Sequence, residues 1–282
     1  MFDVASRSEH AAHQRAVGAL RVSFKRRGAA TVLDGLHQAG CLKARFPRVE
    51  AADWATSVTL NTSGGIAGGD RLALSFDLAA GTRATIAAQA AERFYRALPG
   101  GAPSSVRTRI GVADGAAVEW LPQETILFDR CALDRRLEVD LAPDAWFLGV
   151  ESLVFGRAAM GETVAEAWLR DVIRVRRGEE LLLHDAIRLD GTVDEAMRRA
   201  AAGNGARAVA TVVHVAPSAP AALDAVRAAF SDVDGVECGA SAWNGMLIAR
   251  ILAPTSARLR AGVTAALCVL RDGRALPRVW TC

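Results

Sequence analysis

Lysine is nearly absent from this chain of 282 residues, and its scarcity limits the partners that the chain can have. Lysine occurs only at Lys25 and Lys43, although lysine and arginine together number 34 against 31 acidic residues, which gives a net charge of +3. Proteins that bind nucleic acids gather their positive charge on one face or stripe. The arginines here are spread along the sequence, so we expect no nucleic-acid partner.

Long hydrophobic runs are also missing. No apolar stretch approaches the roughly 20 residues that a helix needs to cross a bilayer. The first residues, "MFDVASRSEHAAHQ", have acids and histidines where a signal peptide has its hydrophobic region. We therefore predict a globular protein that is cytoplasmic and has no membrane segment.

The cysteines and histidines do not have the spacing of a metal site or a disulfide framework. The five cysteines are far apart and include no CxxC pair, so we interpret them as buried, reduced thiols, except that Cys282 could be exposed. Three histidines are isolated: His37, His184 and His214. His10 and His13 are three residues apart and could bind a metal weakly if they shared a helix face.

Common catalytic motifs are absent as well. The chain has no GxSxG, no HExxH and no cysteine beside an evident base. An acid pair such as Asp70 and Glu151 could serve glycoside hydrolysis, so a β-rich hydrolase remains an alternative. Sugar clefts are usually lined with aromatic residues, and this chain has a single tyrosine, Tyr95.

Alternating apolar and polar residues predict strands through the first two thirds of the chain. The pattern is clear in "RLALSFDLAAG", "VRTRIGVADGAAVEWLP" and "RRLEVDLAPD". We expect these strands to be antiparallel with one exposed face, and Asp114-Gly115 to form a hairpin turn. From Ala145 to Phe155 apolar residues occupy both parities, which predicts a strand covered on both sides.

After about Asn204 the pattern changes to strands mixed with two helices. The first helix is predicted in "SAPAALDAVRAAF". The second begins behind Pro254, with Thr255 or Ser256 as its cap, and ends near Gly273. We predict a flexible tail over residues 1–18 and one domain over 19–282, which consists of a β body to about 203 and an α+β flank over 204–282.

A dense glycine cluster stands before the strand that begins near residue 71. In "LNTSGGIAGGDRL" the glycines are Gly64, Gly65, Gly68 and Gly69. Because they precede a strand, and neither GK[ST] nor GxGxxG is present, a phosphate-binding loop is not indicated. Two close glycine pairs favour backbone with positive φ or close approach by another segment.

Three acidic residues occur among apolar ones. Asp70 has the parity of Leu72, Asp185 has the parity of Ile187, and Glu151 lies inside the doubly apolar stretch. Buried carboxylates must be paired, hydrogen-bonded, protonated, metal-bound or in contact with internal water. Pairing with the abundant arginines and a functional path of carboxylates are both open, and oxygen ligands suit a divalent cation in passage.

Five blocks in order give the chain a resemblance to the urease accessory protein UreD family, also called UreH. They are "LNTSGGIAGGDRL", "AAQAAERFYRA", "VEWLPQETILFD", "VFGRAAMGE" and "LPRVW". The resemblance covers nearly the whole chain from about Ala19. It implies a mainly β fold, a two-layered and helical-like stack of antiparallel and mixed strands, with a small α+β flank carrying two C-terminal helices.

The same resemblance implies a non-enzymatic role in the maturation of urease. Such a protein is expected to bind apo-urease and UreF, with the GTPase UreG joining through UreF, and to help deliver nickel through an internal tunnel. The positions that match tunnel-lining acids are Asp70, Glu151 and Asp185. We expect nickel in transit there and no tightly bound cofactor, because tight binding would stop passage.

Further positions in these blocks have predicted structural or partner roles. Arg157 and Glu162 are candidates for an ion pair that fixes a turn. Tyr95 and Arg96 could pack locally or face a partner. Trp280 could anchor a partner, since aromatic residues are enriched at interfaces, or it could belong to the core.

Overall fold

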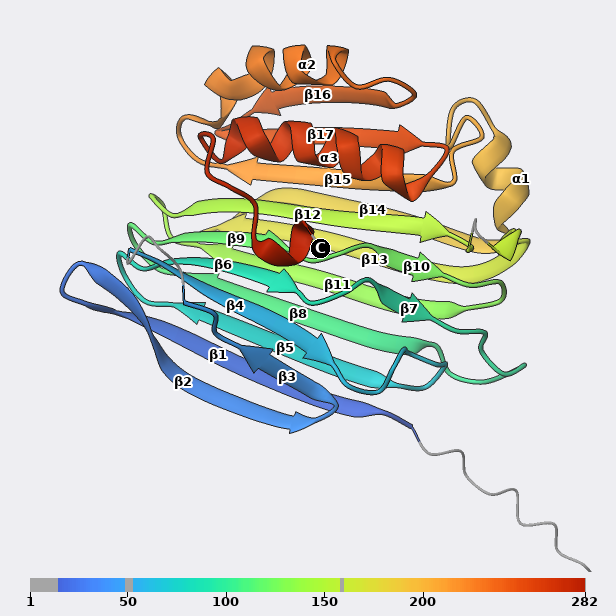
Figure 1. Cartoon of the computed structure of the whole chain (residues 1–282), viewed down its shortest axis with the longest axis horizontal. Helices are drawn as coiled ribbons and strands as arrows, with labels where there is room; N and C mark the ends of the chain where they lie inside the picture. Colours follow the sequence, from blue (N-terminus) through green and yellow to red (C-terminus); the bar gives the residue numbers. More distant parts are fainter. Residues whose placement is uncertain (1–14, 49–52, 158–159, 282) are drawn as a thin grey trace, which may run out of the picture.

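Two β-sheets stacked face to face form most of this protein in the computed structural model, which describes residues 15–48, 53–157 and 160–281 (Figure 1). Sheet A has seven strands in the order β14 (Glu180–Thr192), β13 (Glu166–Arg177), β11 (Ala132–Leu141), β8 (Ser104–Val112), β5 (Arg71–Leu78), β1 (Val17–Arg27) and β2 (Ala30–Gly40). Strand β1 begins at Val17, so residues 17 and 18 of the predicted tail belong to a strand. The rest of the predicted tail, residues 1–14, lies outside the described residues.

Sheet B is longer and holds the strands of the C-terminal flank. Its main path runs β16 (Glu237–Trp243), β17 (Met246–Ala253), β15 (Ala208–Val215), β12 (Trp146–Phe155), β9 (Ala117–Leu121), β6 (Arg83–Ala88), β4 (Trp54–Asn61) and β3 (Leu42–Arg45). The short strand β10 (Thr125–Leu127) pairs with β12 and with β7 (Glu92–Phe94).

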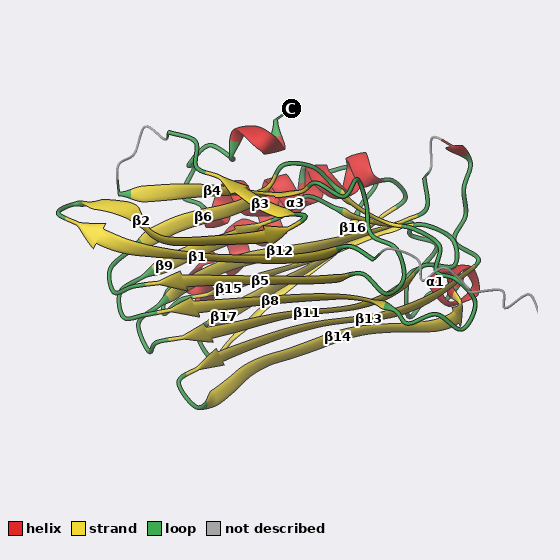
Figure 2. Cartoon of the chain, turned by 90° about the horizontal axis from the view of Figure 1, so that it is seen from below, coloured by secondary structure: helices red, strands yellow, loops and turns green. Residues whose placement is uncertain are grey.

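From β4 to β13 the chain passes back and forth between the two sheets, so this part of the chain winds as a helical stack (Figure 2). Within sheet A, the β1–β5, β5–β8, β8–β11 and β11–β13 pairs are all parallel. The mainly β, mixed and stacked fold is confirmed, but the expectation of antiparallel pairing for these strands was wrong. Asp114-Gly115 does not close a hairpin, because it connects β8 of sheet A to β9 of sheet B. In this wound part each strand pairs with the strand one turn of the stack away and runs parallel to it, whereas the edge pairs β1–β2 and β13–β14 are antiparallel.

The turns between sheets stack on one another at one end of the molecule. The Ala113 N–H donates to the Leu78 carbonyl (3.0 Å), and the Ala142 N–H donates to the Val112 carbonyl (2.9 Å). Gly115, with φ +63°, donates its N–H to Asp144 Oδ1 at 2.9 Å. Hydrogen bonds between turns thus continue the pairing beyond the ends of the strands.

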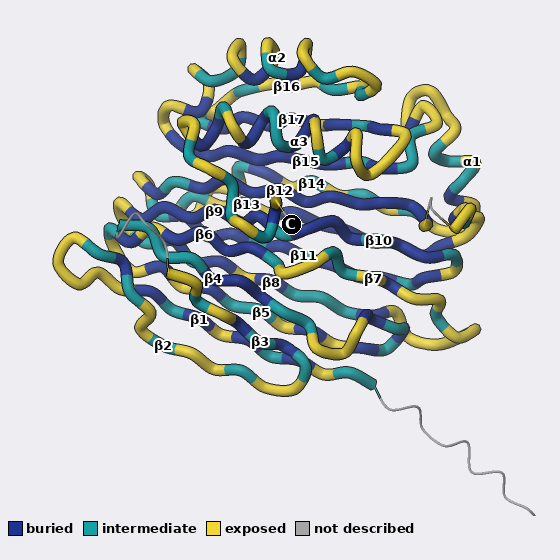
Figure 3. Tube along the Cα trace, in the orientation of Figure 1, coloured by how far each residue is buried: buried dark blue, intermediate teal, exposed yellow. Residues whose placement is uncertain are grey.

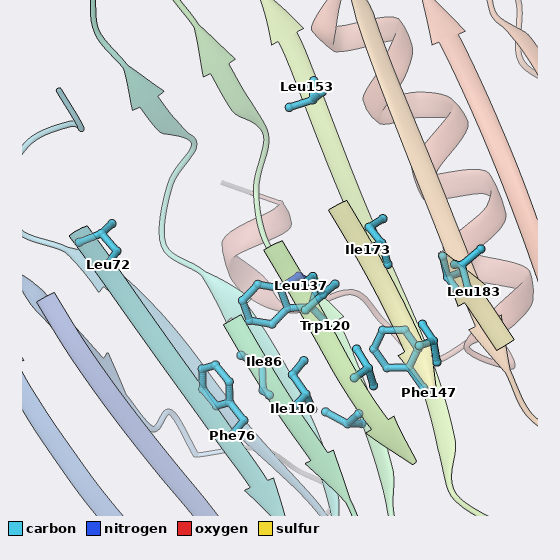
Figure 4. Close-up of a cluster of buried hydrophobic side chains, with 14 of the residues drawn as sticks. Leu72, Phe76, Ile86, Ile110, Trp120, Leu137, Phe147, Leu153, Ile173 and Leu183 are labelled. Carbon is cyan, nitrogen blue, oxygen red and sulfur yellow. The ribbon is translucent and has the colours of Figure 1, made fainter. Parts of the chain in front are cut away.

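The main hydrophobic core fills the space between the two sheets. Figure 4 shows Phe76 and Leu137 of sheet A beside Trp120 and Phe147 of sheet B. The residues on the outer face of sheet A are far more exposed than the residues of the middle strands of sheet B (Figure 3). Nine of the ten residues of β12 are buried, as its apolar sequence predicted, because the core covers one face and the C-terminal helices cover the other.

The C-terminal flank continues sheet B and covers its outer face. Helix α2 (Leu223–Ser231) packs on β16, and helix α3 (Ser256–Leu270) packs on β15 and β17. Thr255 caps α3 as predicted, since its hydroxyl accepts a hydrogen bond from the Arg258 N–H (3.2 Å). The sequence did not predict the short helix α1 (Val193–Arg198) after β14. None of the helices in the described parts of the chain is long and apolar enough to cross a membrane.

Candidate functional site

The glycine cluster forms a tight turn that other segments approach closely. Gly64, Gly65 and Gly69 have φ values of +82°, +147° and +86°. A Cβ on Gly65 would lie 2.2 Å from the Tyr95 ring, and one on Gly68 would lie 2.9 Å from the Ala97 Cβ. Side chains at these positions would clash with that segment or strain the backbone.

Asp70 closes this turn with its carboxylate. Oδ1 accepts the Ala16 N–H and Oδ2 accepts the Ala67 N–H, both at 2.8 Å. The Asp70 carbonyl accepts the Ser105 N–H at 2.8 Å. Asp70 is 5% exposed, so its burial is compensated by backbone donors, and it fixes the glycine turn to the start of β1.

A cavity of about 210 Å³ opens between the sheets next to the glycine turn. Its lining includes the exposed residues Gly64 and Arg93. It also includes three buried residues, which are Trp120, Arg135 and Glu151. Asp70 is not among the described residues that line it. The cavity therefore leads from the protein surface toward a buried ionic cluster.

Glu92 adds a carboxylate to the wall of the same cavity. Its Oε2 accepts a hydrogen bond from Asn61 Nδ2 (3.1 Å), and its Oε1 accepts the Arg93 N–H (3.3 Å). Burial raises the pKa of Glu92 above its usual value, although these hydrogen bonds oppose the shift. The wall thus carries an acid whose charged form is disfavoured by burial.

Glu151 belongs to a buried cluster with Arg135 and Asp171. Arg135 Nη1 lies 2.6 Å from Glu151 Oε2, and Glu151 Oε1 accepts the Trp120 Nε1–H at 2.8 Å. Asp171 accepts two hydrogen bonds from Arg135, at 2.8 Å from Nε and 2.5 Å from Nη2. One guanidinium thus serves two carboxylates, and burial raises the pKa of Glu151 above its usual value even though Arg135 opposes that shift.

Asp185 lies on the far side of this cluster from the large cavity. Its Oδ1 and Oδ2 accept Arg250 Nη2–H (2.7 Å) and Nη1–H (3.2 Å). Together with Glu151 and Asp171 it lines a second cavity of about 10 Å³, which is room for about one water molecule. Glu151 lines both cavities.

The structure therefore brings Glu151 and Asp185 to one cavity and places Asp70 elsewhere, in the glycine turn. Sequence reasoning missed Arg135 and Asp171. A signal was present, since Asp171 has the parity of the buried Leu169 and Ile173. Among the described residues, no group of three or more His, Cys, Asp and Glu side chains has an arrangement that could hold a metal ion.

Tyr95 and Arg96 follow β7, at the surface beside the glycine turn. The Tyr95 hydroxyl donates to the Gly64 carbonyl (3.0 Å), and its ring contacts Phe128 edge-on at 5.0 Å between centroids. Tyr95 is still 36% exposed, and Arg96 is exposed. Tyr95 combines local packing with an exposed edge, which leaves both predicted roles open.

Arg157 and Glu162 form an ion pair with 2.7 Å between Nε and Oε2. Arg157 also lies over the Phe128 ring, 4.3 Å from its centroid. The Arg157 hydrogen bond lowers the pKa of Glu162 below its usual value. These contacts hold the two ends of the loop between β12 and β13.

Trp280 is buried, with 7% of its surface exposed. Its Nε1–H donates to the Leu121 carbonyl at 3.0 Å, and Arg260 lies 5.3 Å from its ring centroid. A side chain packed in this way offers little surface to a partner. Trp280 thus packs in the core of this chain, and a role for it toward a partner stays a prediction.

None of the described cysteines lines either of the two cavities. Cys41, Cys131, Cys238 and Cys268 are free, and Cys268 is exposed, although buried thiols were expected. His10, His13 and Cys282 lie outside the described residues.

Comparison with known proteins gives one family for nearly the whole chain. Residues 16–281 match the family model described as "UreD urease accessory protein". The chain is 46% identical over 272 residues to urease accessory protein UreD 2 of Methylorubrum populi, which covers 95% of this chain and 91% of that one. It is 46% identical over 268 residues to UreD of Dinoroseobacter shibae (95% and 92% covered), and 42% identical over 277 residues to UreD of Xanthobacter autotrophicus (98% and 94%). The chain therefore belongs to the UreD family of urease accessory proteins.

Proposed function

We propose that this chain is a non-enzymatic scaffold of urease maturation that passes nickel ions between its two sheets. In this proposal it works in the cytoplasm and binds apo-urease and UreF, with UreG joining through UreF. The nickel ion is cargo, and the chain keeps no tightly bound cofactor.

The observation that carries this proposal is the position of Glu151. Its carboxylate lines both the 210 Å³ cavity beside the glycine turn and the small cavity that Asp171 and Asp185 share. Carboxylate oxygens with retained water are suitable weak ligands for a divalent ion, and conduction requires sites that a cation can leave. A row of partly compensated carboxylates between the sheets has these properties.

A hydrolase that uses Asp70 and Glu151 is supported less well. Such an enzyme needs two carboxyl groups on either side of one cleft. The Asp70 carboxylate is occupied by two backbone N–H groups, and Asp70 is not among the described residues that line the large cavity. These contacts suit a structural carboxylate.

The test is the nickel content of urease purified from cells that express all accessory proteins together with Glu151→Gln/Asp185→Asn. These substitutions keep side-chain volume and remove two negative charges from the path. We expect nickel per urease to fall about tenfold, the scale on which loss of groups around a metal site lowers metal affinity. Pull-down of urease and UreF with the variant checks that the complex still forms.

The matched control removes two acids from the outer face of sheet A. Glu138→Gln/Asp140→Asn makes the same charge change on β11, where both side chains point away from the core. We expect full nickel content with this control. Full nickel content with Glu151→Gln/Asp185→Asn, in an assembled complex, would contradict the conduit and leave a scaffold alone.

A further inference from the structure

Arg135 stands between the two cavities. Its side chain lines the large cavity and is 10% exposed, while the two carboxylates that it binds, Glu151 and Asp171, line the small one. A fixed positive charge at this position repels any metal ion that approaches from either side. The positive charge of Arg135 therefore opposes the passage of a cation past Glu151, the residue that lines both cavities.

The contacts of Arg135 are unequal on its two sides. Asp171 holds Nε and Nη2 in a two-bond fork, the stronger arrangement for arginine and carboxylate. Glu151 and the Thr125 hydroxyl share the remaining nitrogen, Nη1, at 2.6 and 2.7 Å. A small tilt of the guanidinium about this fork can therefore break the Nη1 contact with Glu151, while Asp171 still balances the positive charge of Arg135.

The release of Glu151 by Arg135 changes which residue carries the net charge of the cluster. With both acids ionised, two negative charges face one positive charge, so the cluster keeps a net charge of −1. When Arg135 releases Glu151 and stays on Asp171, the charge that remains belongs to Glu151, which lines both cavities. Trp120 keeps its hydrogen bond to the other Glu151 oxygen, so the carboxylate stays in place without the arginine.

We propose that Arg135 is the gate of the ion path: it occupies Glu151 in the closed state and opens by releasing Glu151 while it stays bound to Asp171. This inference rests on the proposed function, since a gate matters only where an ion passes. The arginine acts as a resident cation that an entering divalent ion must displace. It also keeps Glu151 and Asp171 from joining as a tight metal site, which would trap nickel.

The experiment is equilibrium dialysis of the purified full-length chain against Ni²⁺. The variant Arg135→Met/Asp171→Asn removes one charge of each sign. The cluster therefore keeps its net charge of −1, and Glu151 loses the arginine that occupies it. We expect nickel to bind at least about tenfold more tightly than in the wild type, a change of about 1.4 kcal/mol. Adding Glu151→Gln to the variant should abolish the gain.

The control variant makes the same chemical change on the outer face of sheet A. Arg107 and Asp134 form an ion pair there, 2.6 Å apart, so Arg107→Met/Asp134→Asn removes a matched pair that borders neither described cavity. We expect its nickel affinity to equal that of the wild type. A gain equal to that of the Arg135 variant would overturn the gate.

A variant that does not fold is replaced by Arg135→Lys. Lysine keeps the charge but cannot form the fork on Asp171 and reach Glu151 together, so we expect an intermediate gain of roughly threefold. Circular dichroism identifies the folded variants. No gain in a folded Arg135→Met/Asp171→Asn chain, or in Arg135→Lys when that chain replaces it, would overturn the proposal.

Dialysis and urease loading separate the gate from the conduit. A gain in dialysis together with full nickel in urease from Glu151→Gln/Asp185→Asn cells contradicts the conduit. Lost loading together with no gain in dialysis overturns the gate alone.

Discussion

Two buried ionic clusters in this protein have opposite proportions of charge. Between the sheets, one arginine, Arg135, serves Glu151 and Asp171. On the outer face of sheet B, one acid, Glu119, serves Arg271 (2.9 Å) and Arg274 (2.7 Å). Glu119 has no exposed surface, and it is not among the residues that line the two cavities described above.

The difference separates a structural cluster from the cluster that we propose as part of the ion path. Arg271 also donates to the Arg274 carbonyl (2.9 Å), so the Glu119 cluster fastens the segment after α3 to sheet B and leaves no acid uncompensated. The Arg135 cluster leaves a carboxylate in excess beside two cavities. Burial of charge is common to both clusters, so the proposed ion path rests on the excess carboxylate and the adjoining cavities.

The largest effect that we predict comes from removal of the acid in the structural cluster. Glu119→Leu leaves Arg271, which is 4% exposed, buried without its partner. We expect the free energy of unfolding to fall by about 3–5 kcal/mol, because breaking a buried pair strands a charge. Denaturant unfolding measures the loss, with Glu138→Gln as the outer-face reference.

The comparison also concerns nickel. The nickel content of urease, normalised to folded Glu119→Leu chain, should match that of the wild type, because Glu119 lies outside the proposed path. A loss of stability below about 1 kcal/mol would show that this cluster does not fasten the C-terminal segment. A loss of nickel from urease without a loss of folded variant would place Glu119 in the proposed path. The distinction between the Glu119 and Arg135 clusters would then not hold.

A smaller effect is expected in the pH dependence of stability from Glu151. Burial raises its folded-state pKa above the usual 4.5, so the folded chain keeps this proton at pH values where the unfolded chain has lost it. The resulting stabilisation is complete below about pH 4.5 and is lost as pH rises through the folded pKa. The difference in unfolding free energy between wild type and Glu151→Gln should therefore fall above pH 4.5, by at most about 1.4 kcal/mol per pH unit.

Denaturant unfolding at a series of pH values gives this difference curve. Comparing wild type with Glu151→Gln cancels the contribution of Glu92, which is present in both chains. The same curve for Glu138→Gln serves as the reference. A difference that rises with pH would mean that Arg135 dominates over burial, and the Glu151 cluster would then resemble the structural one.

The sequence predicted the elements of the fold better than their pairing. Alternation located β5, doubled apolar parity located the covered strand β12, and Thr255 marked the start of α3. Alternation tells which residues share a face, but it carries no information on which strand lies next to it. For this reason Asp114-Gly115 was interpreted as a hairpin, although it crosses between the sheets.

The site was predictable in its residue types and not in its contacts. The parity of Asp185 and the apolar setting of Glu151 indicated inward carboxylates, and the same rule applied to Asp171 and Arg135 would have found the whole cluster. That Arg135 reaches acids on β12 and β13 depends on the register within sheet A and on the stacking of sheet B. Neither the register nor the stacking can be predicted from the periodicity of a single strand.

The smallest effect is expected at the pair of Asp185 and Arg250, because its arginine is more exposed than any side chain of the two clusters. The Arg250 side chain is 53% exposed and that of Asp185 12%, so water screens the pair from one side. Arg250→Gln should lower the free energy of unfolding by only about 0.2–1 kcal/mol, and high salt should shrink the difference further. Denaturant unfolding at low and high salt measures both. A loss above about 3 kcal/mol that salt leaves unchanged would mean that this pair acts as a third buried ion pair, which joins β14 to β17. The excess of carboxylate, rather than its position beside the cavities, would then be the feature that distinguishes the Glu151 cluster.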